Sequence, residues 1–192
     1  MWVYNIGVQA LLTQSQKENN ATEFYYYFDN YGCTIESICG MLGNIDAESG
    51  INPGNKETAS STSGWGLIQW TPATVLTSWC NLRDYYWYDG VIQCYVIECE
   101  GEGKQDCGGR FLPTNDYPYT WDEFTQLTDI EEATKAYFYE RERGTSSTLQ
   151  NRIDKANEWY TYLTGLPPSP TPPTPTPRRK FPLIFMIKEY TH

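Results

Sequence analysis

Two segments of this chain carry side chains whose types and spacing suit the cleavage of a sugar bond. The first, Gly43 to Pro53, places Glu48 at the end of an apolar-faced helix. The second, Gly64 to Pro72, reads Gly-Trp-Gly-Leu-Ile-Gln-Trp-Thr-Pro and combines glycines, two indoles and an amide. Breaking a glycosidic bond needs a carboxylic acid that keeps its proton near neutral pH, and apolar surroundings favour that protonated form. We therefore predict that Glu48 is a general acid in a cleft.

A second catalytic carboxylate is less clearly marked. Asp46 lies two residues before Glu48, so on a helix it points to a different side. Glu57, in the loop that follows, is the predicted base or nucleophile facing Glu48 across the groove. Asp84 is a more remote alternative, and a site that works without a second carboxylate is a further one.

The predicted substrate-binding residues come from the same two segments, and they are Ser49, Trp65, Gln69, Trp70 and Thr71. Indole rings offer apolar faces on which sugar rings stack. The amide of Gln69 and the hydroxyl of Thr71 could hold a water or a sugar amide in place of a second carboxylate. For Gln69, a structural role in satisfying buried backbone groups is an equally good interpretation.

Together, the two segments resemble the phage tail lysozyme family, and more distantly goose-type lysozymes and lytic transglycosylases. The resemblance runs from about Asn20 to about Leu163, and its third element is Tyr139-Glu140-Arg141, followed by Arg152 and Ala156. It implies a lysozyme-like fold without cofactors, a serine at position 49 that orients Glu48, and a virion-carried enzyme that acts on the peptidoglycan of the bacterial cell wall.

Three functions compete within this resemblance. The first is a muramidase that cleaves the β-1,4 bond between N-acetylmuramic acid and N-acetylglucosamine. The second is a lytic transglycosylase, in which the muramyl 6-hydroxyl attacks that bond in place of water. The third is a glycan-binding module of the same fold without activity, which the presence of Glu48, Ser49 and Gln69 disfavours.

Charge and histidine content exclude several other classes of protein. The net charge is −10, and residues 1–166 alone hold 10 basic and 23 acidic residues, so binding to a phosphate backbone is disfavoured. The single histidine is His192, at the end of the chain. A zinc site, or a peptidase built on a cysteine–histidine or serine–histidine pair, is therefore disfavoured as well.

Six cysteines allow fifteen disulfide pairings, and the sequence does not choose among them. Cys94, Cys99 and Cys107 flank a glycine-rich loop and are predicted to include bridged residues. Cys39 lies on the apolar face of a helix and is predicted to be buried. We find no signal peptide, because the N-terminus lacks a basic region and a long apolar core.

The spacing of apolar residues predicts an α+β fold that is mainly α, with a small strand region after the Glu48 helix. Helices are expected over residues 20–31, 34–48, 71–82, 89–100, 130–142 and 152–164, with Pro72 at the first position of the third. Thr34 is a predicted cap, and Thr120 with Glu123 forms a predicted capping box.

The domain prediction is a catalytic domain over residues 1–166, a proline-rich linker over 167–177 and a disordered basic and apolar tail over 178–192. The linker holds seven prolines in eleven residues, which predicts an extended polyproline conformation. The apolar run after it is too short to cross a membrane. We expect the tail to be dispensable for catalysis and interpret it as a possible contact for phage tail proteins.

Overall fold

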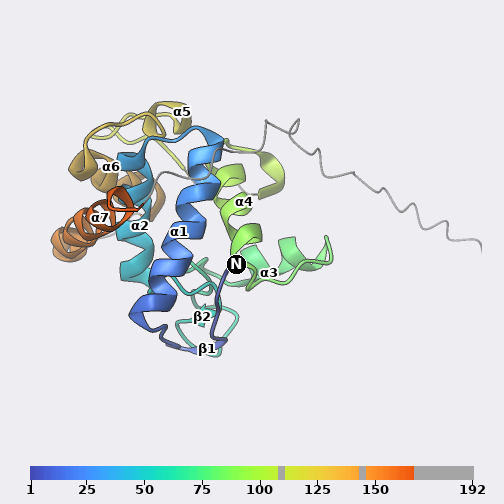
Figure 1. The fold of residues 1–192 in the computed structure, drawn as a ribbon. Coiled ribbons are helices and arrows are strands. Elements are labelled where there is room, and N and C mark those ends of the chain that lie inside the picture. The colour runs from blue at the N-terminus through green and yellow to red at the C-terminus, as the bar shows by residue number, and fades with distance from the viewer. Residues whose placement is uncertain (108–110, 143–145, 167–192) are drawn as a thin grey trace, which may run out of the picture.

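The computed structural model describes residues 1–107, 111–142 and 146–166, and this part of the chain is mainly helical with a small two-stranded sheet (Figure 1). The α+β, mainly α prediction is thereby confirmed. The linker and tail predictions, 167–177 and 178–192, lie outside the described residues. The elements are β1 (Gly7–Val8), α1 (Gln14–Tyr31), α2 (Ile35–Ser49), β2 (Asn55–Lys56), α3 (Thr74–Asn81), α4 (Gly90–Gly101), η1 (Gln105–Cys107), α5 (Trp121–Phe124), α6 (Ile130–Tyr137), η2 (Phe138–Glu142), η3 (Ser146–Thr148) and α7 (Leu149–Thr164).

Helix α2 is the centre of the molecule, and helices α1, α6 and α7 pack around it. Thr34 caps its N-terminus as predicted, through a hydrogen bond from the Ser37 amide to the threonine hydroxyl. Gly50 ends the helix in the left-handed conformation, with a φ of 63°. Because α2 is buried along most of its length, the residue at its last turn is held in a fixed place.

Two glycines of α2 allow its neighbours to approach closely. A Cβ atom at Gly40 would lie 2.7 Å from the backbone of Ala133 in α6. A Cβ atom at Gly43 would lie 2.3 Å from the carbonyl oxygen of Arg152 in α7. The missing side chain at Gly43 therefore brings α7, and Arg152 with it, against the C-terminal half of α2.

The strand region follows α2, as predicted. Strand β2 pairs in parallel with β1 near the N-terminus. The chain then folds back, and an antiparallel bridge joins Lys56 to Trp65 and a second one joins Trp65 to Trp70. We call residues 55–70 the hairpin segment; in Figure 1 it lies at the lower end of α2, beside the two strands.

Four predicted helices differ from the observed ones, and the last of them, α7, starts at Leu149 rather than at residue 152. Helix α1 starts at Gln14, several residues earlier than expected, because Thr13 and Gln16 form a capping box. Helix α3 starts at Thr74, after a cis Thr71–Pro72 bond, so Pro72 is not its first residue. The helix expected over 130–142 ends at Tyr137 and continues as the π-helical turn η2.

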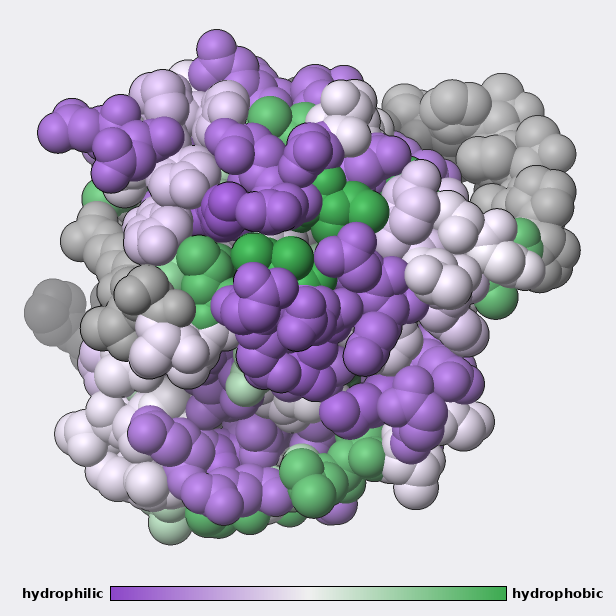
Figure 2. Space-filling model, turned by 90° about the vertical axis from the view of Figure 1, so that its left-hand side faces the viewer, coloured by the Kyte–Doolittle hydropathy of each residue, from purple (hydrophilic) through white to green (hydrophobic). Residues whose placement is uncertain are grey.

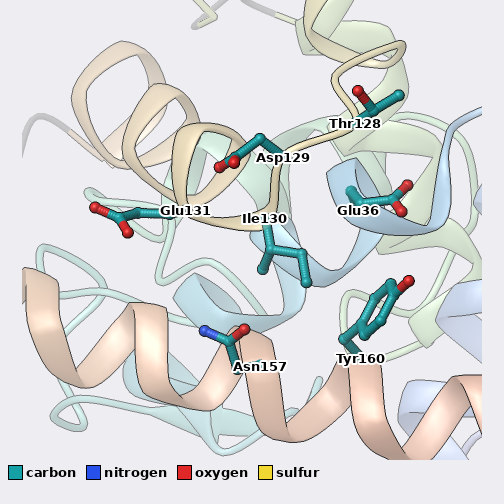
Figure 3. A pocket seen from close by; sticks show the side chains of 7 residues that line it. All are labelled: Glu36, Thr128, Asp129, Ile130, Glu131, Asn157 and Tyr160. Atoms are coloured by element: carbon teal, nitrogen blue, oxygen red, sulfur yellow. The ribbon is translucent and has the colours of Figure 1, made fainter.

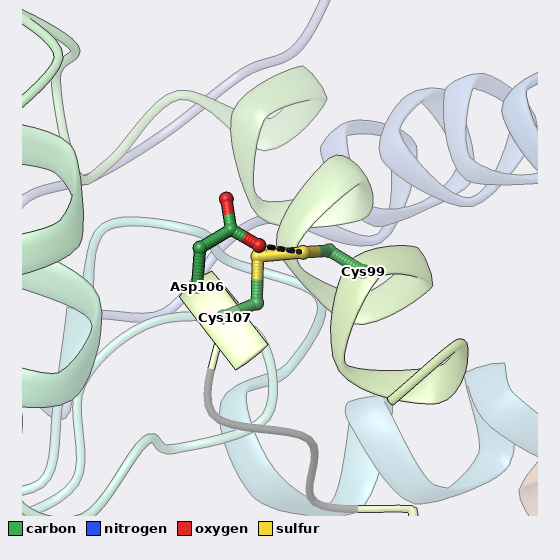
Figure 4. Close-up of side chains that lie close together, drawn as sticks. All are labelled: Cys99, Asp106 and Cys107. Atoms are coloured by element: carbon green, nitrogen blue, oxygen red, sulfur yellow. Dashed lines mark hydrogen bonds between the residues drawn. A yellow bond between two sulfur atoms is a disulfide. The ribbon is translucent and has the colours of Figure 1, made fainter. Parts of the chain in front are cut away.

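The cysteines divide into one bridge and four buried thiols. Cys99 and Cys107 form a disulfide, and the Oδ1 atom of Asp106 lies 3.6 Å from the Cys99 sulfur (Figure 4). These three side chains are close enough together to suggest a metal site, but both sulfurs are used in the bridge. Cys33, Cys39, Cys80 and Cys94 are free and buried, as expected for Cys39. None of the described helices is both long and apolar enough to span a bilayer.

Candidate active site

Glu48 lies in the last turn of α2 and is partly open to solvent, with 23 % of its side chain exposed. Its Oε1 atom forms a short ion pair with the guanidinium of Arg152 from α7. The two residues are 104 positions apart in the sequence. This carboxylate lies at the end of a buried helix and is oriented by an ion pair from a second helix. It nevertheless stays accessible to solvent.

Both terminal nitrogens of the Arg152 guanidinium donate hydrogen bonds, whereas no acceptor among the described residues reaches its Nε atom. One nitrogen donates to the backbone oxygen and to the side-chain oxygen of Asn44, both at 3.2 Å. The guanidinium carbon lies 5.0 Å from the centre of the Phe138 ring. Asn44 is itself oriented, because its amide nitrogen donates to the carbonyls of Gly40 at 2.8 Å and of α6 at 3.1 Å. Asn44, Arg152 and Phe138 thus form a frame behind Glu48.

Asp46 points away from Glu48, as its position on the helix predicts. Its carboxylate accepts from Lys17 at 2.8 Å, from Lys155 at 3.0 Å and from the indole of Trp159 at 3.3 Å. The side chain is 5 % exposed. These contacts tie α2 to α1 and α7, so Asp46 is a structural residue.

Glu57 is exposed in the hairpin segment. Its amide donates to the Gly64 carbonyl at 2.8 Å, and its Oε2 atom accepts from the Gly64 amide at 3.1 Å. The side chain is therefore oriented by the opposite arm of the hairpin. Asp84, the alternative second carboxylate, is exposed in the turn after α3 and has a φ of 55°.

Gln69 and Thr71 are engaged with their own segment. The Gln69 amide donates to the Gly66 carbonyl at 2.8 Å, and its backbone has a φ of 49°. The Thr71 hydroxyl donates to the Gln69 carbonyl at 3.0 Å and is exposed. Ser49 donates to the carbonyl of Ile45, one turn back in the helix, and is buried. These contacts show Gln69 supporting the turn, in line with the structural interpretation of that residue.

The two tryptophans of the motif at residues 64–72 have different surroundings. Trp70 is fully buried, and its indole donates to the Oε1 atom of Glu100 at 3.0 Å. The other oxygen of Glu100 accepts from Arg141 at 2.8 Å, so a buried chain of polar groups joins this motif to the Tyr-Glu-Arg element. Trp65 is half-buried, and its ring is open enough to receive the ammonium of Lys56 at 3.9 Å from the ring centre. In this structure Trp70 belongs to the core, and Trp65 faces the surface.

Glu140 is a buried carboxyl that forms no ion pair with any of the described residues. The Tyr119 amide donates to its Oε1 atom at 3.0 Å, and among the described residues no donor reaches Oε2. Loss of solvent on burial raises the pKa of Glu140 to about 8, against the opposing effect of the Tyr119 amide. Glu140 is therefore largely protonated at neutral pH.

Sequence reasoning did not identify Glu100, and it named Arg152 only as part of the resemblance. A charged residue at a position of an apolar helical stripe was the available signal for both. Arg152 precedes Ile153 and Ala156 in α7, and Glu100 follows Cys99 in α4. Charged side chains are rarely buried unless they are paired, so such positions point to a buried partner.

A shallow pocket lies away from these residues, between the starts of α2 and α6 and the middle of α7 (Figure 3). None of the predicted site residues lines it. Asp129 caps α6 and Glu131 pairs with Lys135, so two of its three carboxylates already have structural roles. Figure 2 shows a largely hydrophilic face with hydrophobic residues in a band across it and at its lower edge.

Two comparisons with known proteins bear on this site. The family model of the phage tail lysozyme matches residues 19–163, a range that includes Glu48, the hairpin segment and Arg152. Morphogenesis protein 1 of Bacillus phage B103 is 31 % identical over 164 residues, which is 81 % of this chain. The chain spans 42 % of the length of that relative.

Proposed function

Because the chain belongs to the phage tail lysozyme family, we propose that it is a glycosidase that degrades peptidoglycan. The bond cleaved is the β-1,4 bond between N-acetylmuramic acid and N-acetylglucosamine. The observation that carries the proposal is the partly exposed Glu48 carboxyl, held by Arg152 at the end of the central helix.

In the proposed reaction, Glu48 protonates the oxygen that leaves. The leaving sugar is a poor leaving group as an alkoxide, so proton transfer from a positioned acid accelerates departure. A glycan lying over the partly exposed carboxyl excludes bulk water from it. The frame of Asn44, Arg152 and Phe138 fixes the direction from which the proton is delivered.

Glu57 is the proposed second carboxylate, which activates a water or attacks the sugar. Its support is its exposure, its place on the segment that directly follows the Glu48 helix, and the Gly64 amide that orients it. Without such a group, the muramyl 6-hydroxyl can attack instead of water, and the enzyme is then a lytic transglycosylase. The mass of the products separates the two reactions, because only the second leaves an anhydro end.

Glu48→Gln is the decisive variant, because glutamine keeps the shape of the side chain but cannot donate the proton. We expect the rate of lysis of purified walls to fall by roughly 10²–10⁴-fold while wall binding is kept. Glu158→Gln, at an exposed position of α7, is the matched control and should lyse walls at the wild-type rate. Folded Glu48→Gln protein with full activity would contradict the proposal.

Glu57→Gln is the companion variant. A loss of similar size supports a base or nucleophile at Glu57, and a mild effect assigns that role to Gln69, Thr71 or the substrate. We further propose that the protein is associated with the virion and meets the cell wall from outside. The family and the phage relative support this location, with residues 178–192 as the proposed contact for tail proteins.

A further inference from the structure

A cluster of aromatic side chains lies on the surface next to the hairpin segment. Tyr4 contacts Tyr88 at 4.9 Å between ring centres, and Tyr86 stacks on Tyr88 at 5.3 Å. Trp87 contacts Tyr88 at 5.7 Å and Trp65 at 5.0 Å. Tyr4 is 49 % and Tyr86 is 70 % exposed, and the other three rings are half-buried. We call these five rings the aromatic surface.

A lysine completes the aromatic surface. The ammonium of Lys56 lies 3.9 Å from the Trp65 ring centre and 5.3 Å from the Trp87 ring centre. Within the described part of the chain, no carboxylate lies within ion-pair distance of Lys56. An unpaired cation on two rings is notable because the surrounding chain is strongly acidic, with a net charge of −10.

A buried amide holds the aromatic surface together. Gln93 of α4 is fully buried and donates to the Trp87 carbonyl at 2.6 Å and to the Pro53 carbonyl at 2.8 Å. Its oxygen accepts from the Leu67 amide at 2.7 Å. One side chain therefore connects the loop that carries Trp87 to Pro53, which precedes the hairpin segment, and to Leu67 within that segment.

We propose that the aromatic surface binds the glycan of the cell wall beyond the catalytic residues. The proposal rests on the proposed function, because it extends the binding site for the same polymer. Trp65 belongs both to the hairpin segment and to the aromatic surface. In this proposal, a glycan chain that passes Glu48 along the hairpin segment continues over Trp65 onto Trp87. The apolar C–H faces of the sugars stack on the rings. Lys56 pairs with a carboxylate of the peptide that the muramyl sugar carries.

The chemistry of the aromatic surface favours this ligand over others. Tyrosine and tryptophan combine an apolar face with a polar tip, which matches the alternation of C–H faces and hydroxyl groups on a sugar. The rings of neighbouring pairs are inclined to one another by 19–86°, so the surface is corrugated. The acidic net charge disfavours nucleic acid as a partner.

The test measures binding to insoluble peptidoglycan from which the anionic polymers have been extracted. The full chain with Glu48→Gln is the carrier, so that the walls persist during the measurement. Into it we place Trp87→Ala, the double variant Tyr86→Ala with Tyr88→Ala, or Lys56→Met. Tyr26→Ala, on helix α1, is the control for loss of a surface ring.

We expect Trp87→Ala and the double variant to weaken binding by about five- to tenfold, and Lys56→Met to weaken it by a smaller factor that vanishes at high salt. Tyr26→Ala should bind as the carrier does. Circular dichroism checks the fold, and the double variant decides if Trp87→Ala unfolds, because Tyr86 is largely exposed.

Unchanged binding of peptidoglycan by the double variant would overturn the proposal. This holds also if the double variant loses attachment to another virion protein, because the aromatic surface would then bind a protein and not the glycan. The two proposals fail separately. If Glu48→Gln protein still lyses walls, the catalytic proposal is wrong, and binding of the aromatic-surface variants is then measured over times too short for lysis.

Discussion

Two arginine–glutamate pairs in this molecule have the same chemistry and opposite access to water. The Arg141–Glu100 pair is sealed, with side chains 7 % and 1 % exposed. The Arg152–Glu48 pair has an equally buried arginine, 8 % exposed, but its carboxylate is 23 % exposed. The fully buried Arg141–Glu100 pair can change partner or protonation only at a large cost in free energy. The Arg152–Glu48 pair, whose carboxylate is partly exposed, can do so at a smaller cost. The comparison assigns a structural role to Glu100 and leaves Glu48 available for chemistry.

The largest expected effect on stability is that of breaking the sealed pair. Arg141→Met leaves Glu100 buried and charged, with the Trp70 indole still donating to it. We expect the free energy of unfolding to fall by about 3–5 kcal/mol. Urea denaturation monitored by tryptophan fluorescence measures this. Arg83→Met is the control, because the Arg83–Asp106 pair is exposed and should contribute less than about 1 kcal/mol. Equal losses in the two variants would show that the buried pair is not special.

Local sequence patterns predict much of the helical fold. Thr34 caps α2, and Thr120 with Glu123 forms the expected capping box of α5. Such motifs involve residues three apart, so they are legible in a sequence. Thr13 and Gln16 form the same kind of capping box before α1, with glutamine in place of glutamate. The spacing of apolar residues does not predict this earlier start, because the segment has no clear apolar stripe.

The position of Glu48 at the end of an apolar-faced helix is a local property that the sequence predicts, but the residues that contact it are not. Its contact with Arg152 spans 104 positions, and the Trp70–Glu100 contact spans 30, so neither follows from spacing. Trp65 and Trp70 look alike in sequence, and only long-range packing shows that Trp65 is half-buried and Trp70 fully buried. Long-range packing decides which polar residues are sealed.

Breaking the Arg152–Glu48 pair should lower the stability less, and the activity more, than breaking the Arg141–Glu100 pair. Arg152→Met leaves Glu48 with access to water, so we expect a loss of about 1–2 kcal/mol in the free energy of unfolding. Because the carboxyl loses its orientation, kcat for wall lysis should fall with little change in KM. Arg152→Lys keeps the charge but not the two-pronged contact with Asn44 and Glu48, and should restore activity only in part.

Two results would reverse the assignment of the two pairs. The first is a stability loss in Arg152→Met as large as that in Arg141→Met. The second is full activity of folded Arg152→Met protein, which would show that Glu48 needs no partner to hold it.

A pH-dependent effect separates a carboxyl buried beside a cation from one that pairs with no cation among the described residues. Burial raises the pKa of Glu140 to about 8, far above the ordinary value of 4.5. Between these values the folded protein holds a proton that the unfolded chain has lost. Stability from this group is therefore fully present below about pH 4.5 and is lost as pH rises to about 8, with a slope of at most about 1.4 kcal/mol per pH unit.

Glu140→Gln replaces the protonated carboxyl with a neutral amide of the same shape and removes that slope. Urea denaturation at pH 5 and pH 8 should show the variant gaining stability relative to wild type at the higher pH. Glu158→Gln, at an exposed position, should keep the wild-type slope. If Glu140→Gln keeps it too, Glu140 is ionised in the folded protein and has a counter-charge among the groups around it.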